Sequence, residues 1–166
     1  MNHESLSQPQ EVLEAVGDQA ILDRLHQGEL LMVNSRRRNG LILYKGYYAE
    51  FAGPGAAIGS FFDVSCDRVI SVGDLSLVVP DDQEERQKAY LIRRQWIRLT
   101  HQLTDNPVPL QRAQMILNQF ENYFGMEIVA GIPDEAFALM VGVLPQTVNW
   151  VRSSNDPMDP HLRAPI

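Results

Sequence analysis

The stretch that most constrains this chain is residues 132–153, which read IPDEAFALMVGVLPQTVNWVRS. Pro133 suits the first turn of a helix, because the N–H that proline lacks would be unpaired there anyway. Gly142 can adopt the left-handed conformation that a tight turn between two helices needs. A second proline then opens another helix, in which Val148 and Val151 share one face. The stretch therefore predicts two short crossing helices joined by a turn.

The spacing of small and apolar residues in this stretch is typical of a helix-turn-helix. Ala138 is small where the second helix would cross the first, and Val148 and Val151 would fill the angle between the helices. In DNA-binding proteins with this motif, the second helix lies in the major groove. The sequence therefore favours DNA binding, and an ordinary helical hairpin with an apolar core is the alternative.

Four side chains of the second helix are the candidate DNA contacts. Gln146 and Asn149 carry amides that can pair bidentately with adenine. Thr147 and Arg152 are expected to contact phosphate or a base. Trp150 is either a core residue or a contact to the DNA backbone, and we favour the core.

The run from Leu110 to Arg152 resembles the C-terminal DNA-binding domain of Crp/Fnr-type regulators. It has a helix (LQRAQMILNQFENYFG), a short piece expected to be extended (MEIVAG) and then the helix-turn-helix. The resemblance implies a long dimerisation helix before this domain, and residues 84–103 would play that part. Leu144 stands where the family usually has a Ser or Thr cap. The N-terminal half has no Gly-rich cassette bearing Glu and Arg, so the resemblance implies no cyclic-nucleotide ligand.

The region from Glu29 to Pro80 has the hydrophobic period of strands rather than helices. The strand candidates are GELLMVNS, GLILYKGYYAEF and one or two strands in DRVISVGDLSLVVP, and the turn-rich FAGPGAAIGSFF becomes extended towards its end. Roughly four or five short strands at this spacing predict a small antiparallel sheet or barrel.

Two helices are expected to flank the sheet. The first begins at Glu11 and ends near Gly28, with a soft break at Gly17. The second covers residues 84–103 and is capped by an aspartate just before it. Its predicted apolar stripe is Ala89, Ile92, Trp96 and Leu99. Its later part is rich in arginine, which either flanks a dimer interface or is solvated.

The sequence thus predicts an α+β fold: an N-terminal helix with a small antiparallel sheet or barrel, then a long helix and a C-terminal helix-turn-helix bundle. A Pro-rich linker follows the long helix and divides the chain. We expect an N-terminal domain over residues 1–106, a helix-turn-helix domain over 107–153 and a flexible tail over 154–166.

Charge gives a mixed indication about nucleic acid. The formal net charge is −7, which argues against strong nonspecific binding, because Lys and Arg supply most of such affinity. Three adjacent arginines, Arg36, Arg37 and Arg38, occupy a predicted turn between strands and are candidate phosphate contacts. A solvated hairpin turn is the alternative for this triplet.

No residue pattern points to an enzyme, a cofactor or a metal site. The four histidines are never spaced as zinc ligands, and the single cysteine, Cys66, is expected to be a half-buried thiol. No nucleophile lies in a recognisable motif with its base. No apolar run is long enough to span a membrane, and the polar N-terminus does not read as a secretory signal. We therefore expect a cytoplasmic protein without a membrane partner.

The sequence favours a sequence-specific DNA-binding transcriptional regulator that recognises double-stranded DNA as a homodimer. The alternative is a non-enzymatic protein-interaction or assembly module of a larger complex, in which the helix-turn-helix is only structural. Many Lys and Arg residues around the second helix would favour the DNA-binding regulator over the interaction module, and this chain has few of them there.

Overall fold

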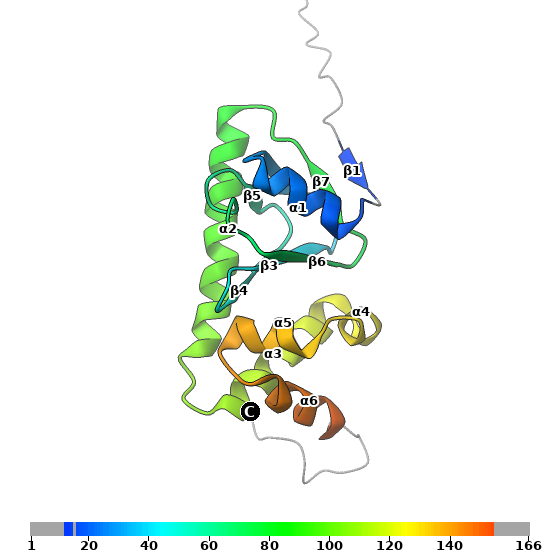
Figure 1. The fold of residues 1–166 in the computed structure, drawn as a ribbon, viewed down its shortest axis with the longest axis vertical. Coiled ribbons are helices and arrows are strands. Elements are labelled where there is room, and N and C mark those ends of the chain that lie inside the picture. Colours follow the sequence, from blue (N-terminus) through cyan, green and yellow to red (C-terminus); the bar gives the residue numbers. More distant parts are fainter. Residues whose placement is uncertain (1–11, 15, 155–166) are drawn as a thin grey trace, which may run out of the picture.

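The computed structural model describes residues 12–14 and 16–154, and it is a mixed α+β fold (Figure 1). The described part has six helices and seven strands, and the strands form two small antiparallel sheets rather than a closed barrel. The strands are β1 (Val12–Glu14), β2 (Leu30–Val33), β3 (Gly40–Tyr44), β4 (Ala49–Ala52), β5 (Ala57–Gly59), β6 (Arg68–Val72) and β7 (Ser76–Val78). The helices are α1 (Asp18–His26), α2 (Gln83–Thr104), α3 (Pro109–Phe124), α4 (Met126–Ala130), α5 (Asp134–Val141) and α6 (Pro145–Ser154). The predicted flexible tail falls, apart from Ser154, outside the described residues.

Three local predictions are wrong. The helix predicted from Glu11 begins only at Asp18, and residues 12–14 instead form β1, which pairs with the edge of β7. The run GLILYKGYYAEF is two strands, because the chain reverses at Gly46, which has a φ of 77°. The piece MEIVAG is not extended but forms α4. In each case the apolar residues are too few or too continuous for periodicity to locate the boundary.

The sheet with strand order β4-β3-β6 is buried on both faces. Leu41 and Leu43 pack into a core that they share with α1 and the other sheet, of order β1-β7-β2-β5. Ile42 and Tyr44, on the opposite face of β3, pack into a second core with α3, α5 and α6. Successive side chains of a strand point to opposite faces, so β3 joins the two cores.

Aromatic rings tie the second core together across the sequence. The Phe51 ring on β4 lies 5.4 Å from that of Trp96 on α2 and 4.9 Å from that of Phe120 on α3. Phe120 in turn meets Phe137 on α5 at 5.2 Å, also edge to face. The predicted division near residue 106 stays a prediction, and one hydrophobic core contains residues from both sides of it.

The long helix α2 runs alongside both halves of the molecule (Figure 1). The sequence predicts this helix over residues 84–103, and in the structure it covers residues 83–104. The Asp82 side chain caps the helix by accepting a hydrogen bond from the Glu85 N–H at 2.8 Å. The predicted apolar stripe is right for Ala89, which is buried, and wrong for Leu99, which is 49% exposed. No described helix is long and apolar enough to cross a membrane.

Arg93 occupies the buried face of α2, against the expectation that its arginines are solvated or flank an interface. Its guanidinium donates to both Asp63 oxygens at 3.1 Å, to Glu50 at 2.6 Å and to the Ala57 carbonyl at 3.0 Å. Lys45 adds a 2.7 Å ion pair to Asp63, whose side chain is fully buried. This ion cluster fastens α2 to the β3–β4 hairpin and to the loop between β5 and β6.

The ion cluster shifts the pKa of Asp63. Burial alone would raise the pKa of this carboxyl, but the charge of Arg93 and hydrogen bonds from Arg93, Lys45 and the Gly59 N–H together hold it below its usual value of 3.8. A carboxyl with a depressed pKa stabilises the fold above that usual value, and the stabilisation is lost as pH falls through the folded-state pKa.

We expect Asp63→Asn to lower the free energy of unfolding at pH 7 by about 3 kcal/mol, because it leaves Arg93 and Lys45 without their buried counter-charge. Urea denaturation at pH 7 and pH 3 measures this, and the difference from the unaltered protein should shrink on acidification. The exposed Asp74→Asn is the matched control. Equal stability of Asp63→Asn and the unaltered protein at pH 7 would contradict the assignment.

Candidate nucleic-acid interface

The two helices α5 and α6 are joined by a turn at Gly142. This glycine has φ 69° and ψ 44°, the left-handed conformation that the sequence predicts there. The Val143 N–H donates to the Ala138 carbonyl at 3.0 Å and closes the end of α5. Helix α6 begins at Pro145, directly after Leu144, whose side chain has no group that could cap a helix. The backbone N–H groups of Thr147 and Val148 donate to the Leu144 carbonyl.

The interior of the α5–α6 pair is apolar, as expected. Ala138, Val148 and Val151 are 2%, 0% and 2% exposed, respectively. They belong to the core that also contains Phe137 and residues of α3. The pair is therefore a rigid part of the fold, and its second helix forms the lower surface in Figure 1.

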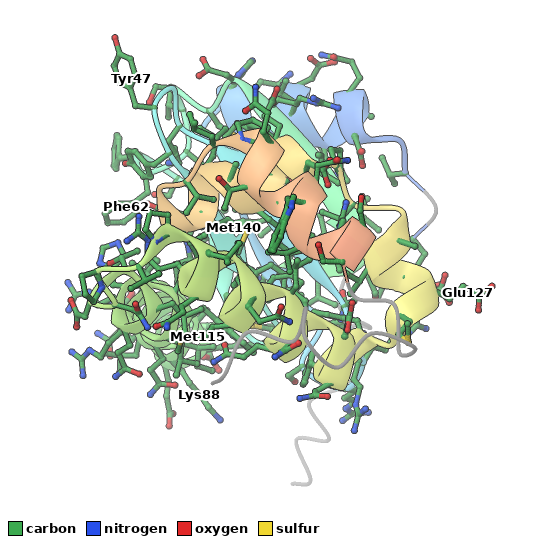
Figure 2. The ribbon with its side chains drawn as sticks, turned by 90° about the horizontal axis from the view of Figure 1, so that it is seen from below. Tyr47, Phe62, Lys88, Met115, Glu127 and Met140 are labelled. Atoms are coloured by element: carbon green, nitrogen blue, oxygen red, sulfur yellow. The ribbon has the colours of Figure 1, made fainter. Side chains whose placement is uncertain are left out.

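The outward face of α6 carries Gln146, Asn149 and Ser153, all exposed, and Thr147 lies half-buried beside them. Figure 2 looks onto the side of the molecule where this helix lies nearest the viewer. Trp150 is 48% exposed, so the expectation that it is a core residue is wrong. Each helical residue advances by about 100°, so a helix that buries Val148 turns position 150 away from the core.

Arg152, predicted as a DNA contact, is held inside the α5–α6 pair. Its guanidinium pairs with Asp134 at 2.7 Å, donates to the Val129 carbonyl at 3.0 Å and lies 5.0 Å from the centre of the Phe137 ring. Asn149 also donates to Asp134, at 3.2 Å. The arginine thus connects α6 to the start of α5 and the end of α4.

Arg112 is a positioning residue that the sequence reasoning did not single out. From α3 it donates to the carbonyls of Val141 at 2.9 Å and Gly142 at 3.0 Å, and to that of Asn106 at 2.8 Å. A cation at the C-terminal end of a helix satisfies carbonyls that have no partner within the helix. Arg112 therefore fixes the turn from another helix, which no local sequence signal reveals.

The charge around α6 is sparse and negative. Residues 107–154 contain two arginines, Arg112 and Arg152, and four acids, Glu121, Glu127, Asp134 and Glu135, so their formal charge is 2 − 4 = −2. Both arginines are engaged within the fold. Any phosphate contact by this region must therefore come from backbone N–H groups and polar side chains, or from residues elsewhere.

The arginine triplet of the β2–β3 turn has its own partners. Arg37 pairs with Glu14 of β1 at 2.7 Å. Arg38 donates to the Tyr123 carbonyl at 3.4 Å and lies over the ring of the same tyrosine. Arg36 is exposed, and its backbone N–H donates to Asn34. The structure thus joins this turn to β1 and to the end of α3, and the phosphate role of the triplet stays a prediction.

Other reactive groups do not form a site within the described residues. No cluster of three or more His, Cys, Asp or Glu is placed there to hold a metal ion. Cys66 is 1% exposed rather than half-buried, and burial raises the pKa of its thiol. A buried, protonated thiol is a poor nucleophile, so Cys66 serves packing.

Comparison of the chain with known protein families, with curated protein sequences and with solved structures finds no significant match. The resemblance to Crp/Fnr-type regulators therefore stays a prediction from the residues quoted above.

We expect Arg152→Gln to lower the free energy of unfolding by about 1–2 kcal/mol, because it removes a partly buried ion pair and a hydrogen bond to a carbonyl. Asp134→Asn should lower the free energy of unfolding by a similar amount. The double variant should lose less than the sum of the two single losses, because each change removes the same Arg152–Asp134 interaction. Chemical denaturation measures these values, with the exposed Arg98→Gln as control. Strictly additive losses would show that the pair does not couple α6 to α5.

Proposed function

We propose that this chain is a sequence-specific DNA-binding regulator that acts as a homodimer and reads the major groove with α6. The observation that carries the proposal is the α5–α6 pair itself. Its left-handed Gly142 turn and its buried Ala138, Val148 and Val151 agree with the spacing expected of a helix-turn-helix. The outward face of α6 exposes the polar Gln146, Asn149 and Ser153 beside Trp150. In this motif the second helix enters the groove.

Base recognition in this proposal rests on amides rather than on cations. Gln146 and Asn149 are exposed in the first half of α6, and the N-terminal residues of a recognition helix are those that meet base edges. Their amides can pair bidentately with adenine. Thr147 adds a hydroxyl that can contact phosphate or a base. Arg152 does not touch the DNA in this proposal, and its ion pair with Asp134 holds α6 in position.

The scarcity of free cations favours a dimer. A single helix-turn-helix with a formal charge of −2 neutralises little phosphate, so its affinity should be low and fall only modestly with salt. Two copies on a two-fold operator, with half-sites about 34 Å apart, would double the contacts. The long α2 is the candidate dimerisation helix, as the Crp/Fnr resemblance implies.

Selection of a random duplex DNA pool on the full-length protein, at about 50 mM salt, tests this function. We expect enrichment of a two-fold motif. Gln146→Ala should relax the preference at one base position and cost roughly 1–3 kcal/mol. Gln102→Ala, an exposed glutamine of α2, is the matched control and should leave the motif unchanged. A pool that stays random would refute DNA recognition.

A protein-interaction module is the second candidate, and two exposed apolar side chains favour it. Leu144, just before α6, and Trp150, in the middle of it, are 68% and 48% exposed. Tryptophan is enriched among the residues that anchor protein interfaces, and Leu144 would add apolar surface next to it. In this alternative the same face of α6 packs on a protein, and the DNA pool gives no enrichment.

A further inference from the structure

A cavity of about 660 Å³ lies beside α2, between that helix, the β3–β4 hairpin and the loop after β5. Its apolar lining comes from Tyr48, Phe62, Tyr90, Leu91 and Ile97. Phe62 and Tyr90 meet at 5.7 Å between ring centres, and Figure 2 shows Phe62 beside α2. The volume falls within the range of roughly 300–1,000 Å³ typical of small-molecule sites.

The cavity is separate from the space between the two sheets. That space is filled by side chains such as Leu41, Leu43 and Ile58, which are no more than 1% exposed. A ligand would therefore lie outside the β core, against α2, and would have to suit the groups found there.

The charged lining of the cavity consists of Lys45, Glu50, Arg93 and Arg94, and Gln87 adds an uncharged polar group. Behind it lies the fully buried Asp63, so three cations face two carboxylates and the formal balance is 3 − 2 = +1. Arg94 is exposed, whereas Arg93 is 7% exposed. The cavity therefore favours an anion over a cation.

Arg93 also offers a hydrogen bond that nothing in the described part of the chain accepts. Its two terminal nitrogens are engaged by Asp63, Glu50 and a carbonyl, but its buried Nε–H has no partner there. A buried donor without an acceptor is costly. The Nε atom is itself covered by the protein, so this unmatched donor adds to the positive character of the Arg93 side of the cavity and is not a direct contact for a ligand.

From these observations we propose that the cavity binds a small organic carboxylate with an apolar body. The apolar body lies among Tyr48, Phe62, Tyr90, Leu91 and Ile97, and the carboxylate pairs with the exposed Arg94. None of its residues belongs to α5 or α6, so the site is separate from the proposed DNA-reading helix, although it shares α2 with the proposed dimer interface.

Titration calorimetry of the full-length protein with decanoate, below its micelle concentration, tests the site, with 1-naphthylacetate as the aromatic probe. Saturable binding of either acid is expected. Among octanoate, decanoate and dodecanoate, affinity should rise roughly fourfold per methylene, the increment for burying such a group. Decanol and decyltrimethylammonium, which lack the carboxylate, should bind at least about fivefold more weakly than decanoate.

Two exposed residues of α2 provide variants that should not disturb folding. Arg94→Gln removes the pairing cation and should weaken decanoate binding about fivefold. Leu91→Glu places a negative charge in the wall and should weaken it roughly tenfold or more. Arg98→Gln and Leu99→Glu make the same changes on exposed residues outside the lining and should leave binding unchanged.

Three results would overturn the proposal: no binding of either acid to the folded protein, equal binding of decanol, or equal losses in the control variants. The last two would mean that the probes adhere to exposed apolar surface. Preserved circular dichroism of each variant separates loss of binding from loss of folding.

Discussion

The fold depends on one strand that is buried on both of its faces. Leu41 and Leu43 of β3 pack towards α1 and the second sheet, and Ile42 and Tyr44 pack towards α3, α5 and α6. A strand in this position leaves no solvent face, so helices must cover the sheet on the side away from the second sheet. The candidate helix-turn-helix is that cover, and it is rigidly placed because Phe51, Phe120 and Phe137 interlock across the contact.

Several arginines of this chain stabilise the fold through buried or partly buried hydrogen bonds and ion pairs. Arg112 and Arg152 hold the turn and the two helices of the α5–α6 pair, and Arg93 fastens α2 to the sheet. A guanidinium is suited to such places because its donors are fixed in a plane and its charge persists when buried. As a result, the exposed side of α6 carries amides and an indole rather than positive charge.

Arginines also line the cavity beside α2. Arg93 is paired with Asp63 and Glu50 and leaves its Nε–H unmatched, and Arg94 supplies the net positive charge next to the apolar wall. The proposed DNA-reading surface and the proposed carboxylate site thus lie on different elements. Helix α2 is next to both regions. It contacts β4, which belongs to the hairpin on one side of the cavity, and it also contacts α3 and α5.

The sequence by itself determined the local events with a local cause. Asp82 caps α2, Gly125 ends α3, Gly142 turns between α5 and α6, and Ala138, Val148 and Val151 are buried, because capping, positive φ and helical spacing are properties of a few neighbouring residues. Only the tertiary structure decided that residues 12–14 pair with β7, that Trp150 faces outward and that Arg93 is buried. The tertiary structure also decided that Arg152 pairs with Asp134 and that Arg112 donates to the carbonyls of the turn at Gly142. Each of these outcomes depends on a partner 18 or more residues away, or on the direction in which a whole helix packs, and neither is encoded in the pattern of adjacent residues.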